Sequence, residues 1–163
     1  MNTFVGKGAG KYVIKRLFNA KRQALICSPY LSKPYAEAIV KMVERGVNVK
    51  LITSNEKTRN FHAHAYIMKY SQTNGQKGSL DFTIVGSSFI HAKMYVADDD
   101  FAAFGSANLT IAGMWENVEN IVTYDGAEGI SIRKGFERIW KYNSKGIANG
   151  KERGDLSISA KTS

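Results

Sequence analysis

The chain has 163 residues, 44% hydrophobic and 23% charged, a balance that fits one globular domain with its own core. Its one cysteine, Cys27, excludes an internal disulfide, and no apolar run is long enough for a signal peptide or a membrane span. We therefore expect a cytoplasmic protein with a buried, structural thiol and no membrane partner.

The net charge of +9 is concentrated toward the two ends. Residues 1–22 hold six basic and no acidic residues, and residues 131–163 hold eight basic and three acidic. Residues 23–130 hold nine basic and eleven acidic residues. Basic ends favour a polyanionic partner, because neutralised phosphates release condensed counterions. A solvated face that keeps the protein soluble is the alternative interpretation.

The first half of the chain alternates apolar runs with amphipathic segments. After a flexible start, helices are predicted over 9–20, 32–45 and 55–70, strands over 23–29 and 47–53, and a loop over 71–79. Ser32 is placed to cap the second helix and Gly46 to end it. In the first helix the inward positions are Tyr12, Val13, Leu17 and Phe18. The strand, helix and strand over 23–53 form a βαβ unit, which predicts a parallel pair.

In the second half, strands are predicted over 80–85, 89–97, 101–106 and 118–124, with turns at 86–88 and 98–100. A short helical stretch follows Asn108. A final helix spans 127–142, with Ile130, Phe136, Ile139 and Trp140 as candidate core residues. The fold class is α/β, a mixed, mostly parallel β-sheet flanked by helices on both faces. One domain covers 1–147, and 148–163 is a polar, frayed tail.

Alternation within 89–97 separates two faces of one strand. Ile90, Ala92, Met94 and Val96 share the face that meets the core. His91, Lys93 and Tyr95 share the other, so the imidazole and the ammonium project together.

These two residues open a spaced motif. His91, Lys93, Asp98, Gly105, Ser106 and Asn108 fall within eighteen residues. At background frequencies, six fixed positions recur at roughly one start site in 10^7. The pattern resembles the hallmark of the phospholipase D superfamily, H-x-K-(x)4-D-(x)6-G-S-x-N, and every position matches. Glu119, within Asn117–Asn120, stands where small bacterial nucleases of this superfamily place a glutamate, and residues 44–50 resemble their helix–glycine–strand junction. The resemblance covers about residues 10–142.

The resemblance implies a metal-independent phosphodiesterase without a cofactor. His91 would attack phosphorus and form a phosphohistidine, and Lys93 would stabilise developing charge. Ser106 and Asn108 would donate hydrogen bonds to the phosphoryl oxygens, and Glu119 would accept the Nδ1 proton of His91. Asp98 would mainly orient and stabilise the site.

The implied mechanism needs a second histidine, and the chain holds one copy of the motif. His62 and His64 lie two apart in a predicted helix, about 200° around its axis, so they share no face. Without a third ligand they do not indicate a metal site. A two-fold homodimer that brings two His91 side chains to one phosphodiester would complete the site.

The function expected is hydrolysis of DNA, with RNA left open as a substrate. Tyr30, Tyr35, Tyr95 and Trp115 are candidates for base stacking, with packing at least as good an explanation for each. Two alternatives stay open. One is a phospholipase D-type lipid phosphodiesterase, which would need an apolar access surface. The other is a nucleic-acid-binding module with a vestigial site.

Overall fold

The structure is a computed structural model and describes residues 1–73, 75–86 and 90–144. Its strands are β1 (Asn2–Gly6), β2 (Gln23–Cys27), β3 (Asn48–Ser54), β4 (Leu80–Val85), β5 (Met94–Ala97), β6 (Phe101–Gly105) and β7 (Glu119–Asp125). The helices are α1 (Gly10–Phe18), α2 (Lys33–Glu44), α3 (Lys57–Ser71) and α4 (Ile130–Ser144), with a π-helical turn η1 (Ala112–Glu116) and a 3-10 turn η2 (Gly126–Gly129).

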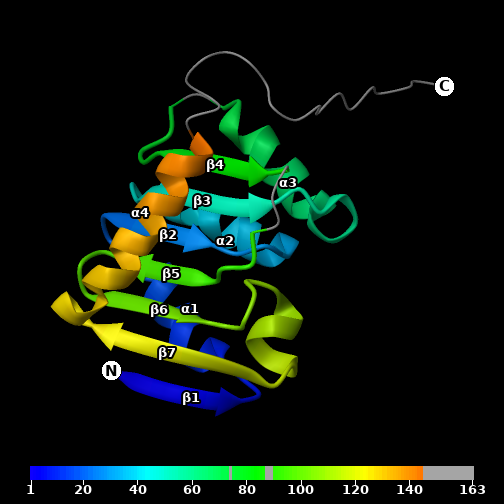
Figure 1. The fold of residues 1–163 in the computed structure, drawn as a ribbon. Coiled ribbons are helices and arrows are strands. Elements are labelled where there is room, and N and C mark those ends of the chain that lie inside the picture. The colour runs from blue at the N-terminus through cyan, green and yellow to red at the C-terminus, as the bar shows by residue number, and fades with distance from the viewer. Residues whose placement is uncertain (74, 87–89, 145–163) are drawn as a thin grey trace.

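The strands form one seven-stranded sheet in the order β1-β7-β6-β5-β2-β3-β4 (Figure 1). The pairs β2–β3 and β3–β4 are parallel, as the βαβ pattern predicts. The other four pairs are antiparallel. The mixed α/β fold is therefore confirmed, but the expectation of a mostly parallel sheet is wrong. The turn at 98–100 is too short for a crossover, and the segment 106–118 begins and ends at the same end of the sheet, so β6 and β7 each run back beside the preceding strand.

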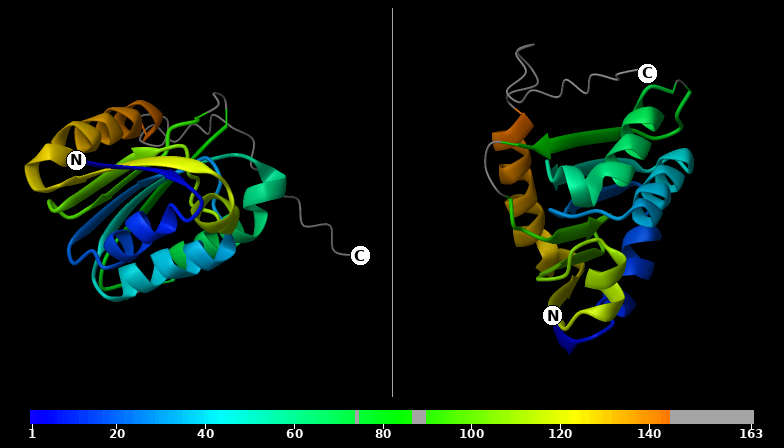
Figure 2. Two further views of the ribbon diagram at one scale, coloured as in Figure 1. Left: turned by 90° about the horizontal axis from the view of Figure 1, so that it is seen from below. Right: turned by 90° about the vertical axis from the view of Figure 1, so that its right-hand side faces the viewer.

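Helices cover both faces of the sheet, as predicted. Helices α1, α2 and α3 pack on one face and α4 on the other (Figure 2). Leu17, Ile39 and Ile67 belong to the first core, and Phe136 belongs to the second. Within the described residues, no helix is both long and apolar enough to cross a bilayer.

The strand expected over 89–97 is shorter in the structure. Its described part begins at Met94, which pairs with Cys27 on one side and Phe104 on the other. Strand β2 ends at Cys27, opposite Met94, and β6 ends at Gly105, whose N–H donates to Lys93 O at 3.3 Å. Before Lys93 neither neighbouring strand continues, so the backbone has no strand to pair with there. Ile90, Ala92, Met94 and Val96 do share a face, packed in the core under α4. Tyr95 is fully buried on the opposite face, so that face is core rather than polar surface.

Two further expectations need correction. The start is not a flexible lead but β1, an edge strand paired with β7, and Gly8 then turns the chain at φ 88°. Ile130 is 55% exposed, because η2 delays the start of α4 and turns Ile132 inward instead. Tyr12 is also exposed, and its ring packs on Phe4. The tail from 148 and the turn residues 87–88 lie outside the described residues.

Candidate active site

The start of β5, the end of β6 and the start of β7 meet at one end of the sheet, here called the motif end (Figure 1). His91 and Lys93 come just before β5, Ser106 and Asn108 follow β6, and Glu119 is the first residue of β7. Because β5 and β2 are antiparallel, the carboxyl end of β2 lies there too. Antiparallel pairing therefore gathers five of the six predicted site residues.

Lys93 is buried beneath the motif end, while His91 is exposed. The Lys93 side chain is 4% exposed, and its Nζ donates a 2.8 Å hydrogen bond to the His91 backbone oxygen. Burial lowers the pKa of Lys93, and the charge of Glu119 opposes that shift, as does Cys27 to a smaller extent. An ammonium removed from bulk water interacts strongly with a nearby phosphate.

Cys27 lies under the same residues and is buried, as predicted. Its Sγ is 3.4 Å from the Ala92 backbone oxygen. Burial raises the pKa of Cys27 to about 12, against the lowering effect of the Lys93 charge. The group is therefore a packed thiol at neutral pH rather than a nucleophile.

Glu119 is a buried carboxylate with two side-chain donors. The Ser106 hydroxyl donates to its Oε2, and Asn117 Nδ2 donates to its Oε1 at 3.3 Å. Ser106 also accepts the Asn120 backbone N–H at 3.0 Å and donates its own N–H to Asn120 O at 3.0 Å. These contacts fix the Ser106 hydroxyl and the Glu119 carboxylate relative to each other. Asn117 has no role in the sequence interpretation, although it lies two residues before Glu119.

Asn108 is partly buried in the segment between β6 and η1. Its Oδ1 is enclosed and has no hydrogen-bond partner among the described residues. An amide oriented in this way can present its Nδ2 donors toward a ligand.

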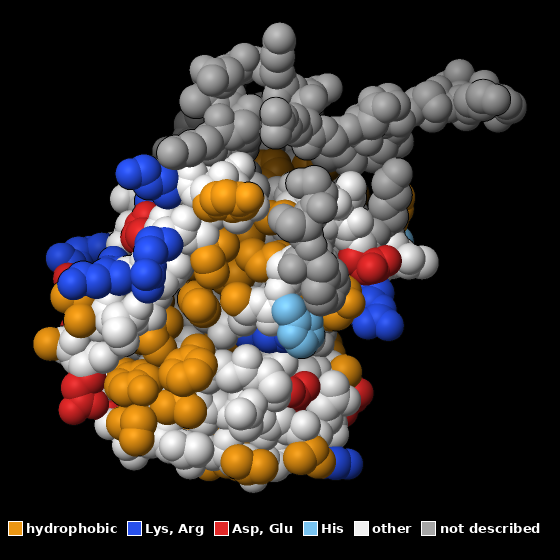
Figure 3. Space-filling view, in the orientation of Figure 1, with side chains coloured by type: hydrophobic (Ala, Val, Ile, Leu, Met, Phe, Trp, Pro, Cys, Tyr) orange, Lys and Arg blue, Asp and Glu red, His pale blue; other side chains and the backbone are white. Residues whose placement is uncertain are grey.

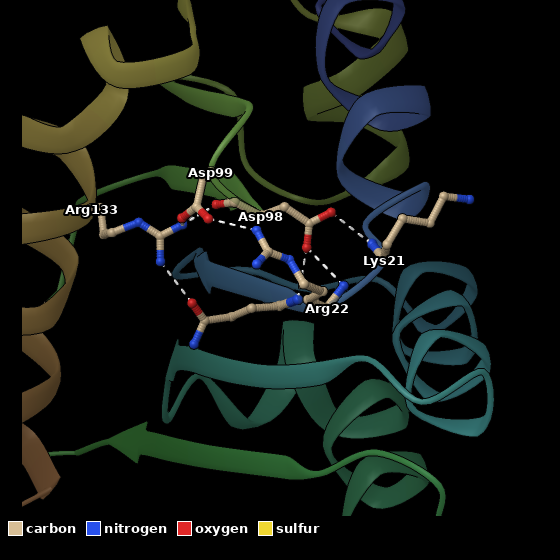
Figure 4. Close-up of polar contacts among 6 residues, drawn as sticks. Lys21, Arg22, Asp98, Asp99 and Arg133 are labelled. Carbon is tan, nitrogen blue, oxygen red and sulfur yellow. Dashed lines mark hydrogen bonds and ion pairs between the residues drawn. The ribbon is translucent and has the colours of Figure 1, made fainter.

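The sixth predicted residue, Asp98, lies at the opposite end of the sheet. Figure 4 shows its carboxylate directed at Lys21 and Arg22. Strand β5 separates Asp98 from Lys93 by five residue steps, about 16 Å at 3.3 Å per residue. Its carboxylate accepts the backbone N–H groups of Lys21, Arg22 and Gln23 at 2.7–2.9 Å. Burial tends to raise the pKa of Asp98, but the three donors and the Arg22 charge outweigh it and lower the pKa. Asp98 thus anchors the α1–β2 turn and is not brought to the site.

A pocket of about 290 Å³ lies beside Asp98 and is also away from the motif end. Its rim carries Asp99 and Arg133, which are paired with each other. Arg133 also donates to the Gln23 side-chain oxygen at 2.7 Å and to the Asp98 backbone oxygen. These charged groups serve the packing of α4 against the β5–β6 turn.

The two remaining histidines lie on α3, as predicted. His62 is exposed, with Phe61 edge-on to its ring. His64 is partly buried, and its Nε2 lies 2.5 Å from Thr53 Oγ1 on β3. Burial lowers the pKa of His64 to about 4, so this imidazole is neutral near pH 7. His64 therefore packs between α3 and β3 as a neutral hydrogen-bonding group.

Of the four candidate stacking residues, the structure buries two. Tyr95 is fully buried, and Tyr35 is buried with its ring stacked on Phe18. Trp115 is partly exposed and donates its Nε1 hydrogen to the Tyr35 hydroxyl at 2.8 Å. Tyr30 lies just beyond β2 at the motif end, with the Arg59 guanidinium 4.8 Å from its ring centroid. Tyr30 and Trp115 are the two whose rings remain accessible.

The basic N-terminal residues divide between the two ends of the sheet. Gly6 pairs with Glu119, so Lys7 and Lys11 lie where the chain turns from β1 into α1 at the motif end, and both are exposed. Helix α1 then runs to the opposite end. There Arg16 pairs with Asp125, and Arg22 pairs with Asp99 at 2.6 Å.

An apolar surface borders the motif end on the face that carries α4. Phe104 and Val5 project from this face and are 40% and 69% exposed, and Val118, just before β7, is 68% exposed. The Phe104 ring stacks on Tyr124. Figure 3 shows hydrophobic side chains spread over this face beside α4, while Lys and Arg lie on the outer side of that helix. This surface is not evident from the sequence.

The sequence matches the model of one protein family over most of its length. A model described as the phospholipase D-like domain of cardiolipin synthase matches residues 13–140. The chain belongs to the phospholipase D superfamily. The resemblance inferred from His91 to Asn108 is thereby confirmed.

Among curated relatives, this phospholipase D-like chain is 32% identical over 116 residues to the major cardiolipin synthase ClsA of Bacillus subtilis. That match covers 69% of this chain but 23% of ClsA, so the chain spans about a quarter of the relative's length.

Two solved structures share the fold. Nuc of Salmonella typhimurium, a phospholipase D family member, has a TM-score of 0.69 at 21% identity, over 86% of this chain and 94% of that one. TrmBL2, an archaeal chromatin protein whose structure shows a novel mode of DNA binding, has a TM-score of 0.60 at 19% identity. That match covers 87% of this chain and 53% of the TrmBL2 chain. These likenesses confirm the phospholipase D-like fold.

Proposed function

We propose that this protein is a metal-independent nuclease that hydrolyses DNA, and by extension RNA, through a phosphohistidine formed on His91. The observation that carries the proposal is the convergence of His91, Lys93, Ser106, Asn108 and Glu119 at one end of the sheet. Residues 1–147 would form the catalytic domain, with 148–163 as a tail. The single cysteine, a buried free thiol, is consistent with a cytoplasmic location.

The proposed reaction has two displacement steps at phosphorus. In the first, a ring nitrogen of His91 forms a P–N bond while the bond from phosphorus to the leaving bridging oxygen breaks. That oxygen takes a proton from a second imidazole. In the second, a water gives its proton to that imidazole, attacks phosphorus and breaks the P–N bond. Lys93 and Asn108 would bind the non-bridging oxygens, and Ser106 would join them by turning its single hydroxyl hydrogen from Glu119 to the phosphate. Glu119 would hold the other ring nitrogen of His91.

The second imidazole would come from His91 of another copy of the chain. Neither other histidine lies in an H-x-K pattern, and both are on α3 rather than beside β5 and β6. His64 packs against Thr53, and His62 lies on another side of the helix. A two-fold axis at the motif end would place two His91 side chains on opposite sides of one phosphate. The exposed Val118 beside Glu119 provides apolar area for such a contact.

Exposed cations at the motif end favour a polyanionic substrate. Lys7, Lys11 and Arg59 are exposed there, where phosphates flanking the scissile bond would pass. Tyr30 and Trp115 offer accessible rings for bases. The shared fold with the DNA-binding TrmBL2 is consistent with this choice.

A second candidate is a phospholipase D-type lipid phosphodiesterase. Two observations favour it: the similarity to cardiolipin synthases, and the apolar surface formed by Val5, Phe104 and Val118 next to the site. That surface would contact acyl chains in a lipid enzyme and a second subunit in the nuclease.

The test uses single- and double-stranded DNA, RNA, and vesicles of phosphatidylglycerol and cardiolipin, all in excess EDTA. Wild type and His91→Ala are compared on each substrate. Cleavage of nucleic acid by wild type alone supports the nuclease. Turnover of lipid alone replaces it with the lipid enzyme. Binding of DNA without cleavage of any substrate supports a vestigial binding module, and equal cleavage by both proteins rejects His91 as the centre.

A further inference from the structure

The Asn108 segment is held by hydrogen bonds on both sides of the asparagine. The buried Tyr95 hydroxyl donates to the Ala107 backbone oxygen at 2.7 Å. The buried Ser28 hydroxyl accepts the Leu109 backbone N–H at 2.8 Å. Asn108 therefore lies between two peptide groups, each anchored by a side chain from a different strand end.

The hydrogen bonds from Tyr95 to Ala107 and from Leu109 to Ser28 are both shielded from water. Tyr95, Ser28, Ala107 and Leu109 are each fully buried, so no water replaces a missing partner without cost. Neither hydroxyl is assigned a role by the motif.

The Ser28 anchor is itself fixed from two directions. Its hydroxyl donates to Tyr30 O at 2.7 Å, and its backbone N–H donates to Ile52 O at 3.0 Å. Asn60, fully buried on α3, donates to Pro29 O at 2.8 Å and accepts Leu31 N–H at 2.9 Å. Leu31 in turn forms a parallel bridge with Leu109. The loop after β2 is therefore a rigid support for the Asn108 segment.

We infer that Tyr95 and Ser28 are positioning residues that aim the Asn108 side-chain amide at the phosphoryl oxygens. The inference rests on the proposed function for the role of Asn108, but the clamp itself is a property of the fold. Asn108 Oδ1 is enclosed without a protein partner among the described residues, so packing and the two backbone anchors set the direction of its Nδ2 donors. A donor misplaced by about 1 Å costs up to about a hundredfold in rate.

The kinetic test compares Tyr95→Phe and Ser28→Ala with wild type on the cleaved substrate. Tyr66→Phe is the matched control, since Tyr66 packs on the core from α3 away from the segment. We expect kcat to fall about 10- to 100-fold in the two clamp variants with little change in KM, because phosphoryl charge grows in the transition state. Combining Tyr95→Phe with Asn108→Ala should give no further loss beyond Asn108→Ala alone. Multiplying losses would overturn the inference, because they would show that Tyr95 acts independently of Asn108.

A second readout does not depend on activity. The Asn108 side-chain NH2 resonances, identified by their absence in Asn108→Ala, are followed by NMR during titration with inorganic phosphate. We expect Tyr95→Phe and Ser28→Ala to shift these resonances and weaken their response, and Tyr66→Phe to leave both unchanged. Wild-type resonances in both folded clamp variants would overturn the inference. If wild type cleaves nothing yet the clamp variants shift the resonances, the positioning stands and the proposed function fails.

Discussion

The Ser106 hydroxyl donates a hydrogen bond to Glu119 Oε2, which joins the end of β6 to the start of β7. Both residues belong to the motif end, and Asn117 holds the other carboxylate oxygen. The Glu119 charge also raises the pKa of Lys93 against the lowering effect of burial. One carboxylate thus aligns a hydroxyl and favours the charged form of a buried ammonium.

Replacing Glu119 with glutamine should change the pH dependence of the reaction. Loss of the carboxylate charge removes an influence that raises the pKa of Lys93, so that pKa falls further. Lys93 then loses its proton at a lower pH than in the wild type. If activity needs charged Lys93, the alkaline limb of kcat against pH therefore moves to lower pH. Glu116→Gln is the control, because Glu116 is exposed on η1 three residues earlier. An alkaline limb that stays in place in Glu119→Gln would contradict the electrostatic link.

Asp98→Asn should cost stability rather than chemistry. The carboxylate has a lowered pKa in the fold, so its contribution is present above its unfolded pKa of about 3.9 and is lost as pH falls through the folded value. We expect unfolding in urea at pH 7 to become easier by about 1–3 kcal/mol. The difference from wild type should shrink below about pH 4. Asparagine tolerates the φ of 48° at this position, so the backbone is preserved.

The matched control for Asp98→Asn is Asp81→Asn, which changes an exposed carboxylate on β4. It should leave the free energy of unfolding within about 0.5 kcal/mol of wild type. Below the unfolding temperature, kcat of Asp98→Asn should stay within about twofold of wild type, since β5 separates it from Lys93. If Asp98→Asn lost as much kcat as His91→Ala does, Asp98 would have a role in catalysis, and the prediction would be wrong.

Periodicity predicted the elements whose neighbours are close in sequence. The βαβ unit of β2, α2 and β3 is an example, because its pairing follows from tight local connections. Strand β1 was missed because Asn2–Gly6 is short, contains glycine and pairs with β7, more than a hundred residues away. The alternation around His91 continued past the point where β2 and β6 offer partners, so the strand was predicted too long.

In the site, too, relationships between residues close in sequence were predicted, and those between distant residues were not. Motif spacing brought together the residues flanking β5 and β6, since a tight turn returns the chain to the same end of the sheet. The spacing did not show that Asp98 lies across the sheet, although the length of β5 alone implies it. Ser28 could not be found from the motif, because its hydrogen bond with Leu109 joins residues 81 positions apart. A polar residue directly after the buried run Ala24–Cys27 was the available signal.

Lys7 and Lys11 should contribute to nucleic-acid binding through phosphate charge. In a non-cleaving His91→Ala background, Lys7→Gln with Lys11→Gln should weaken binding of DNA. The slope of log K against log salt should become shallower by roughly 0.7–0.9 for each phosphate that a lysine no longer neutralises. Lys21→Gln is the control, because Lys21 is exposed at the opposite end beside Asp98. An equal change in slope for Lys21→Gln would indicate a diffuse charge effect rather than phosphate binding at the motif end. The binding constants are measured by fluorescence anisotropy over a range of salt concentrations.

Val118→Asp should separate the proposed dimer without destroying the site. Val118 is 68% exposed next to Glu119, and a two-fold axis at the motif end would bring the two new carboxylates close together. We expect the dimer to weaken by at least about tenfold, measured by sedimentation velocity. Activity per subunit should fall at low protein concentration and recover at high concentration, whereas damage to the site would persist at every concentration. Ile130→Asp places the same charge at a 55% exposed position at the opposite end and should leave both measurements unchanged. A wild-type protein that is monomeric at concentrations where it is fully active would rule out the shared site, because each chain would then have to supply both the nucleophile and the proton donor.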